Sequence, residues 1–434
     1  MPQAPNLSPR NSSWRDFLGV NASTMALLGA ILLVTAATEL WSPLVPQYLK
    51  SLQTGALAGN TAVILLIGAY GFYRDALEAM NYFAGGAIAG RFNTRRSLLF
   101  FNLLPLVGLA MILLWKSTLA VFVAIPFIFV WDSIAGPATI TVVGDSLPPD
   151  RRTMAFSIQS IFRRVSRMLA YGLSAAVVWL LGSVAGGVRA DVAIAIGLVL
   201  VAVVVQFRHM KTASRDASVT IHRPIEMLRR FPPDLKRLLA ADILARWAEG
   251  LATHFIILFC IPILAVDSVL GASKYQSLLL NIQAATNIAL YLIIGPLASR
   301  EGLAKKPFIG LTFFFFSLFP ISLAVLGPTF GTLGLALAFV IGGMREIGEP
   351  ARKAMIADLV PTEVRTQAIG LYWSARSIAV MFASPIGALL WIGGEHVRPG
   401  LGPQFTFITA GIIGLVGAAV FALRFGRTST PGRG

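Results

Sequence analysis

The sequence contains little of what a soluble enzyme needs. Charged residues make up only 13% of its 434 residues, whereas soluble domains contain roughly 25%. A single cysteine, Cys260, excludes an internal disulfide, and the four histidines are scattered without metal-ligand spacing. No phosphate-binding glycine loop with its lysine occurs, which argues against ATP as an energy source. We therefore expect no cofactor, no metal and no enzymatic activity.

Apolar residues dominate instead. They make up 56% of the chain, and the mean hydropathy is +0.73. Each of twelve apolar segments is long enough to cross the hydrocarbon core of a bilayer as a helix. The sequence thus predicts an all-α polytopic membrane protein with spans near 24–49, 58–88, 97–115, 118–146, 154–181, 191–207, 238–264, 276–298, 307–326, 332–358, 366–392 and 403–423.

The two halves of the chain repeat one pattern. Matched positions differ by 213 in residue number, as for Arg163 and Arg376 (376 − 163 = 213). The same offset relates Gly136-Pro137 to Glu349-Pro350, and it continues through the prolines, acids and arginines that follow. An arginine about ten residues inside an apolar span is expensive, so each of these two is a candidate functional residue.

Basic residues indicate the orientation. With the N-terminus in the cytoplasm, the predicted outer loops contain only Lys50, Lys116, Arg189, Lys274 and Arg398. The positive-inside rule then places both termini in the cytoplasm of a cell (cytoplasmic or inner) membrane. The basic linker 207–237 divides the chain into an N-terminal six-helix bundle, 1–206, and a C-terminal one, 238–434. The net charge of +16 mostly reflects this bias, so we expect no nucleic-acid partner.

Charge inside the spans is unevenly distributed. The third, sixth, ninth and twelfth spans carry none in their cores, and the other spans carry charged or polar residues. A bundle tolerates such groups when they face a shared aqueous cavity. The basic residues at depth are Arg74, Arg163, Arg164, Arg167, Arg246, Arg345, Arg352, Lys353 and Arg376, and the acids are Glu39, Asp75, Glu78, Asp132, Asp242, Glu249, Glu346 and Glu349.

Two loops carry a related motif. The loop after the second span reads Gly86-Ala-Ile-Ala-Gly-Arg-Phe-Asn-Thr-Arg-Arg96, and that after the eighth reads Gly295-Pro-Leu-Ala-Ser-Arg-Glu-Gly-Leu-Ala-Lys-Lys306. With two six-helix halves and a basic central linker, this resembles the major facilitator superfamily over essentially the whole chain. The resemblance implies a secondary transporter that works by alternating access, with its site near the midplane between the halves. The loop aspartate of the family is replaced by Gly90 and Ser299.

The resemblance also suggests which residues meet. Glu39 is expected to pair with Arg163 or Arg167, and Glu249 with Arg376, either to brace each half or to exchange a proton for an arginine. Arg345, Glu349 and Lys353 form an i, i+4 series that could be satisfied within one helix, as could Arg74 with Glu78. Arg164 lies off the Arg163/Arg167 face and is expected to snorkel.

Three groups of candidate residues follow. The cytoplasmic gate would use loop arginines and the acids that end the fourth and tenth spans. The substrate candidates are Arg163, Arg376, Arg345, Trp373, Tyr372 and Gln159; the proton-coupling candidates are Glu39, Asp132 and Glu249; the gate candidates are Arg91, Arg95, Asp145, Arg300 and Asp358.

The sequence therefore predicts a proton-coupled transporter of a small polar, anionic solute, acting as a monomer in membrane lipid. Guanidinium groups suit bidentate binding of carboxylate or phosphate. Sodium in place of protons, and a zwitterionic or cationic solute, remain open. The alternatives are a proton-driven multidrug efflux antiporter, a lipid flippase, and a sensor or scaffold on a transporter fold.

Overall fold

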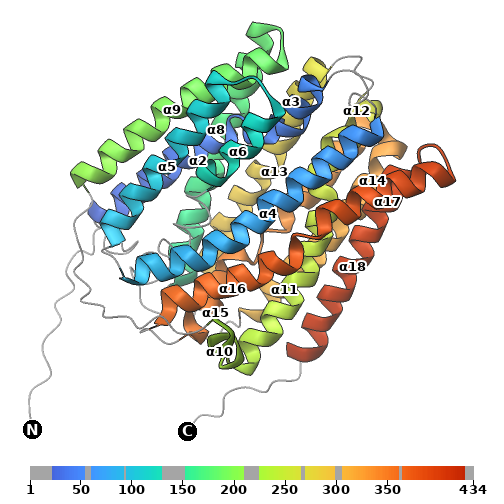
Figure 1. Cartoon of the computed structure of the whole chain (residues 1–434). Coiled ribbons are helices and arrows are strands. Elements are labelled where there is room, and N and C mark those ends of the chain that lie inside the picture. Colours follow the sequence, from blue (N-terminus) through green and yellow to red (C-terminus); the bar gives the residue numbers. More distant parts are fainter. Residues whose placement is uncertain are drawn as a thin grey trace, which may run out of the picture.

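The computed structural model describes residues 22–53, 60–91, 94–129, 152–209, 224–264, 269–298, 305–360 and 364–425. These ranges contain helices and no strand. The first part of the chain forms α2 (Ala22–Glu39), the 3-10 helix η1 (Ser42–Leu44), α3 (Val45–Leu52), α4 (Asn60–Arg91), α5 (Thr94–Leu114), α6 (Thr118–Ile128), α8 (Arg152–Leu181) and α9 (Val184–His209) (Figure 1).

The second part of the chain is also helical. Its helices run beside those of the first part along the long direction of the molecule (Figure 1). They are α10 (Pro224–Arg229), α11 (Pro233–Ala252), the 3-10 helix η4 (Thr253–Phe255), α12 (Ile256–Ile263), α13 (Val269–Ala298), α14 (Lys306–Met344), α15 (Glu349–Leu359), α16 (Arg365–Val380), α17 (Ala383–Val397) and α18 (Leu401–Phe425).

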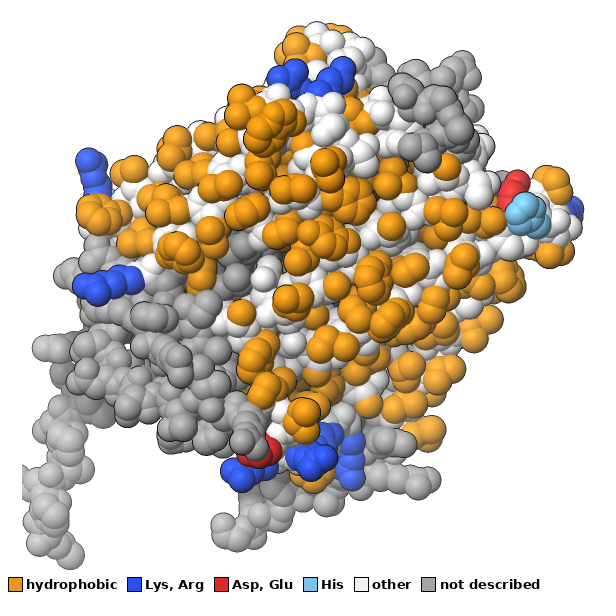
Figure 2. All heavy atoms as spheres, viewed as in Figure 1, with side chains coloured by type: hydrophobic (Ala, Val, Ile, Leu, Met, Phe, Trp, Pro, Cys, Tyr) orange, Lys and Arg blue, Asp and Glu red, His pale blue; other side chains and the backbone are white. Residues whose placement is uncertain are grey.

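The surface of the molecule is apolar over a broad band. Figure 2 shows hydrophobic side chains covering the middle of this face, with lysine and arginine gathered at its margins. Exposed leucine, valine and phenylalanine side chains on several helices contribute to such surfaces, among them Leu180, Leu333 and Leu389. Within the described residues, eight helical stretches are long and apolar enough to cross a membrane. The chain is therefore a multi-pass membrane protein.

Helix α14 is a hairpin rather than one rod. A straight helix of its 39 residues would be about 58 Å long, too long for one crossing. The backbone leaves the helical conformation at Gly331, with φ 58° and ψ −134°. The rings of Phe319 and Phe339, twenty residues apart, lie with centroids 5.6 Å from each other. The chain thus reverses at Gly331, which matches the break predicted between the spans 307–326 and 332–358.

Four apolar segments are interrupted by short irregular stretches. These are η1 between α2 and α3, η4 between α11 and α12, residues 345–348 between α14 and α15, and Met381–Phe382 between α16 and α17. Irregular backbone at membrane depth is tolerated where it lines a cavity or is buried in protein, because its freed polar groups then find partners. Three of the four stretches supply residues to the cavities described below.

Two contacts join the first and second parts of the chain. Helix α4 lies along α16 and α17, and α8 lies along α13 (Figure 1). The α4 contact is close at Gly71, where an added Cβ would lie 2.2 Å from Ser384 Oγ and 2.7 Å from the His254 ring. These two seams leave polar side chains from both parts facing each other in the interior.

Candidate functional site

A central cavity of about 340 Å³ lies between the two parts of the chain. Residues of α4, α8, α11, α15 and α16 line it, together with η4 and the stretch 345–348. Its wall contains eight basic side chains, Arg74, Arg163, Arg164, Arg167, Arg246, Arg345, Lys353 and Arg376, and five acidic ones, Asp75, Glu78, Glu249, Glu346 and Glu349. Among the described residues the wall therefore has an excess of three positive charges.

A second cavity of about 240 Å³ adjoins the first. The two share seven wall residues: Arg74, Phe129, Arg164, Arg167, Thr253, His254 and Arg345. Beyond this shared boundary, the wall of the second cavity comes from α2, η1, α3, α4, α8, α12, α13 and α14, and Glu39 of α2 is the only charged side chain among its described residues. The interior is thus strongly charged on one side of the shared arginines and largely neutral on the other.

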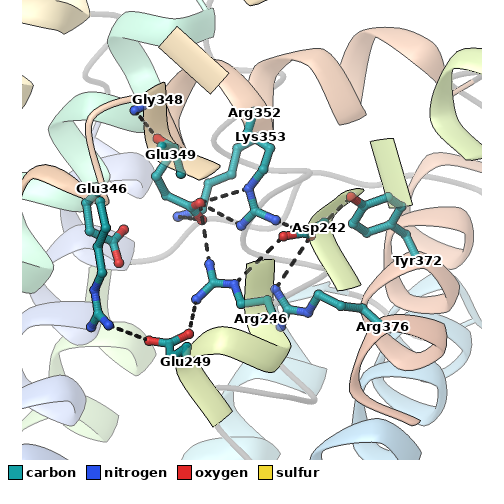
Figure 3. A network of polar contacts seen from close by, with 12 residues as sticks. Asp242, Arg246, Glu249, Glu346, Gly348, Glu349, Arg352, Lys353, Tyr372 and Arg376 are labelled. Carbon is teal, nitrogen blue, oxygen red and sulfur yellow. Dashed lines mark hydrogen bonds and ion pairs between the residues drawn. The ribbon is translucent and has the colours of Figure 1, made fainter. Parts of the chain in front are cut away.

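The densest polar network surrounds Asp242 of α11 (Figure 3). Its carboxylate forms an ion pair with Arg352 of α15, whose side chain is 0% exposed, and accepts a hydrogen bond of 3.1 Å from the Tyr372 hydroxyl. The other edge of the Arg352 guanidinium contacts Glu349 at 2.6 Å. A buried charge requires such pairing, because desolvation without a partner is very costly.

The network continues toward the cavity through Arg246. This guanidinium lies 2.6 Å from Glu249, 3.7 Å from Glu349 and 3.8 Å from Asp242. Glu249 also accepts Arg345 at 3.1 Å. The expected pair of Glu249 with Arg376 is therefore wrong: Glu249 is occupied by Arg246 and Arg345, and Arg376 lies 4.0 Å from Asp242, nearly two turns earlier in α11.

Arg345 also departs from the i, i+4 series expected within one helix. The helix is interrupted over 345–348, so Arg345 reaches Glu249 of another helix and lies over the rings of Phe316 and Phe319. Only Lys353 and Glu349 keep the i, i+4 contact, at 3.8 Å. The interruption turns Arg345 toward the shared boundary of the two cavities.

An aromatic platform supports Arg376. Its guanidinium lies 4.0 Å from the centroid of the Trp373 ring, and Arg352 lies 4.9 Å from the same ring. Tyr82 of α4 packs against Trp373 with centroids 5.9 Å apart. The ion contact of Arg376 with Asp242 is long, and Arg352 and Tyr372 already occupy that carboxylate at closer range. Stacking on Trp373 therefore positions the Arg376 guanidinium, and Asp242 neutralises its charge only weakly.

Two ion pairs involve α8. Arg167 lies 2.6 Å from Glu39, which also accepts a hydrogen bond of 3.0 Å from the Tyr171 hydroxyl. This confirms the expected contact of Glu39 with Arg163 or Arg167. Arg164 contacts Glu346 at 3.1 Å, and Tyr291 of α13 donates to the same carboxylate at 3.2 Å. The expectation that Arg164 snorkels is wrong, because its guanidinium points into the interior and joins the two parts of the chain.

The remaining predicted residues fall into three sets. Arg163 and Gln159 line the central cavity with Arg376 and Trp373, whereas Tyr372 is buried against Asp242. Asp358 pairs with Lys305 at 2.7 Å. Asp132, Asp145 and Arg300 lie outside the described residues, and for Arg91 and Arg95 only the helical backbone is described.

Several cavity residues were not assigned a role from the sequence. Asp75, Arg246, Glu346 and Lys353 all line the central cavity. Arg74, expected to interact with Glu78, lines the same cavity wall as Glu78, and its guanidinium lies 4.5 Å from the centroid of the Phe129 ring. All are charged residues at membrane depth, which was the signal available for each of them.

In the part of the chain that is described, no group of three or more His, Cys, Asp and Glu residues is arranged to hold a metal ion. The cavity wall instead offers guanidinium groups and carboxylates in alternation. Such a wall can bind a small charged solute through bidentate hydrogen bonds, with the carboxylates limiting which solutes enter.

Comparisons with known proteins agree with this architecture. The fold is similar to that of the human organic anion transporter MFSD10 (TETRAN), with 14% identity, a TM-score of 0.70 and coverage of 92% of this chain and 99% of that one. It is also similar to a mutant of the nucleoside transporter NupG (16% identity, TM-score 0.66, 93% and 100% covered). A mutant of the peptide transporter POT in complex with sulfate gives 16% identity, a TM-score of 0.69 and coverage of 93% and 94%.

The search of curated protein sequences finds no match. Residues 243–434 match the family described as Major Facilitator Superfamily. The resemblance seen in the loop motifs and the repeat is thus supported by an independent match in the second part of the chain and by a fold shared over more than nine-tenths of it. The second part of the chain is therefore similar to the Major Facilitator Superfamily, and the chain shares the fold of the three transporters above.

Proposed function

We propose that this protein is a secondary transporter of a small solute carrying negative charge. It would use twelve transmembrane helices in two six-helix bundles, 1–206 and 238–434, joined by the linker 207–237. The seams support this arrangement: α4 and α13 are the second helices of the two halves, and α8 and α16 are the fifth. In each of the two contacts, α4 with α16 and α8 with α13, the second helix of one half packs against the fifth helix of the other half. The two contacts are therefore related by exchange of the halves.

The observation that carries the proposal is the charge of the central cavity. Its wall holds eight basic and five acidic side chains at a depth where each charge is costly. One of the eight, Arg167, is paired with Glu39 of the second cavity, which leaves an excess of two positive charges among the described residues (8 − 1 − 5 = 2), and this excess favours an anion as the solute. Arg376, Arg345 and Arg163 are the residues we assign to it, with Trp373 and Gln159 completing the wall. Among the similar structures are an organic anion transporter and a peptide transporter with bound sulfate.

Proton coupling would operate by competition between a proton and an arginine for one carboxylate. Glu39 is the candidate favoured by geometry, since it has one arginine, Arg167, and one neutral donor, Tyr171. Protonation of Glu39 would weaken its ion pair with Arg167. The Arg167 guanidinium would then be released toward the central cavity, where the solute is proposed to bind. Glu249 is held by two arginines and is harder to protonate, and Asp132 remains a third candidate.

The substrate role of Arg376 is tested by binding and by transport. Purified protein in nanodiscs would be screened with small carboxylates, phosphates and sulfonates by thermal shift, and the best ligand would then be titrated against Arg376→Lys and Arg376→Ala. We expect both variants to weaken binding at least tenfold, because lysine keeps the charge but loses the bidentate, stacked geometry. Arg189→Lys, an arginine bonded to the Leu113 carbonyl outside the cavity, is the control. Unchanged affinity in both Arg376 variants would remove this residue from the site.

The coupling role of Glu39 needs proteoliposomes with an imposed pH gradient. Glu39→Gln should abolish accumulation driven by the gradient and leave exchange of labelled solute intact. Gradient-driven uptake that persists in both Glu39→Gln and Asp132→Asn would place coupling elsewhere. The same vesicles distinguish the alternatives: translocation of headgroup-labelled lipid without solute uptake would indicate a flippase, and selection of apolar cations would indicate a multidrug antiporter.

A further inference from the structure

The two adjoining cavities differ in chemistry, and a single solute can occupy both. The central cavity is rich in charge, whereas the part of the second cavity wall that α12, α13 and α14 form contains mostly apolar side chains. Ile257, Leu279 and Ala284 belong to this wall, as do Phe319 and Phe339, whose rings pack edge to face with centroids 5.6 Å apart. Such a wall has little to offer a hydrated ion and suits a hydrocarbon group.

Two amide groups in the wall of the second cavity are engaged in hydrogen bonds to backbone carbonyls. The Gln276 amide nitrogen donates to the Pro43 carbonyl at 3.0 Å, and that of Asn287 donates to the Gly343 carbonyl at 2.5 Å. Glu39, its one charged residue beyond the shared boundary, is neutralised by Arg167 at 2.6 Å. Among the described residues, this wall contains no cation beyond the shared boundary, so the anionic end of a solute is favoured at the boundary instead.

The shared boundary supplies the cations instead. Arg74, Arg164, Arg167 and Arg345 line both cavities. Arg74 stacks on Phe129 with its guanidinium 4.5 Å from the ring centroid, and it lines both cavities. Arg345 is shared with Glu249 at 3.1 Å and lies against two phenylalanine rings. A compact anionic head fits at this boundary with its apolar tail directed away from the central cavity.

We infer that the substrate is an amphipathic organic anion, with its anionic head at the arginines shared by the two cavities and a single apolar tail of several carbon atoms in the second cavity. This rests on the proposed function and specifies its substrate class. The head provides charge selection, and the tail provides affinity that grows with buried length. A small inorganic anion would occupy the head position alone and bind more weakly.

A homologous series of ligands tests the tail. Isothermal titration of the protein in phosphatidylcholine nanodiscs, with empty nanodiscs subtracted, would compare acetate, butyrate, hexanoate and octanoate. Burial of each added methylene should tighten binding by about fourfold until the second cavity is filled. 1-Octanol and octylamine, with the same tail, should bind far more weakly than octanoate. Equal affinity for acetate and octanoate would overturn the tail site.

Substitutions in the protein test the binding of the ligand's anionic head and of its apolar tail separately. Ala284 lines the second cavity, and Ala285 is its exposed neighbour on α13. Ala284→Leu should weaken octanoate by at least tenfold and leave acetate unchanged, which also shows that the variant is folded, whereas Ala285→Leu should change neither. Arg74→Gln should weaken every chain length by the same factor. Loss of acetate and octanoate together in Ala284→Leu, with Ala285→Leu intact, would contradict a separate tail cavity.

The failure of this inference differs from failure of the proposed function. Anion binding that depends on Arg376 but not on chain length would refute the tail and leave the anion transporter in place. Octanol or octylamine binding as well as octanoate would refute charge selection itself, and with it the proposed anionic substrate.

Discussion

Replacement of Asp242 by leucine should destabilise the protein through the arginine that it leaves behind. The Asp242 and Arg352 side chains are 1% and 0% exposed, so neither charge can recover its hydration when the other is removed. Loss of one partner of a buried pair costs about 3–5 kcal/mol. Glu349 still contacts the other edge of Arg352 at 2.6 Å, which favours the lower end, about 3 kcal/mol.

Thermal unfolding in detergent or nanodiscs measures this loss. With an unfolding entropy of about 2.1 cal/mol/K per residue, a chain of 434 residues loses about 3 °C in Tm for about 3 kcal/mol. The control is Lys305→Met, which breaks an ion pair with Asp358 whose side chains are 21% and 30% exposed and should cost less than about 1 kcal/mol. Because a buried pair can be replaced by apolar side chains at little cost, Asp242→Leu/Arg352→Met should recover most of the stability.

A Tm loss in Asp242→Leu no larger than that in Lys305→Met would contradict a buried charge left without its partner. A double variant that lost the sum of the two single losses would show that the two charges do not compensate each other.

Three further expectations follow from close contacts and charge. Gly387→Ala on α17 should lower Tm by several degrees, because the added Cβ would lie 2.2 Å from the Leu251 carbonyl oxygen. Gly393→Ala on the same helix is the control and should leave Tm unchanged, because its added Cβ would have no atom within 4 Å. Equal Tm values for the two variants would contradict the Gly387 contact. Gly331→Ala should cost about 1–2 kcal/mol, measured as a lower Tm, because its φ of 58° disfavours a side chain; an unchanged Tm would argue against the turn. Glu346→Gln removes the partner of Arg164 at 3.1 Å and should raise anion affinity several-fold by titration; weaker binding would show that Glu346 positions Arg164 instead.

Depth in the membrane was predictable from the sequence because it depends on composition alone. Long apolar runs indicated the helices, and the break at Gly331 falls between two predicted spans. The charged residues expected at depth do meet in the interior, since an isolated charge facing lipid would be too costly. The Glu39–Arg167 contact was predictable for the same reason, together with the neighbouring positions of their helices.

Pairing within the interior was harder to predict because it depends on helix rotation and on irregular backbone. Arg163 and Arg164 are adjacent in sequence and about 100° apart around α8, yet both line the cavity, since it is wide enough to receive two faces of one helix. Residues 345–348 leave the helix, which redirects Arg345 to Glu249 and leaves Arg376 beside Asp242. No periodicity in the sequence marks that interruption.

The wall of the second cavity contains Cys260, the only cysteine in the chain. A thiol reagent can therefore modify the folded protein at one defined position without any engineered substitution. Because this sulfur lies at the inner surface of the cavity and is buried, the rate of its alkylation reports how often the interior opens to a small reagent. The protein thus carries a natural reporter of access to this cavity, suited to mass spectrometry of the intact chain.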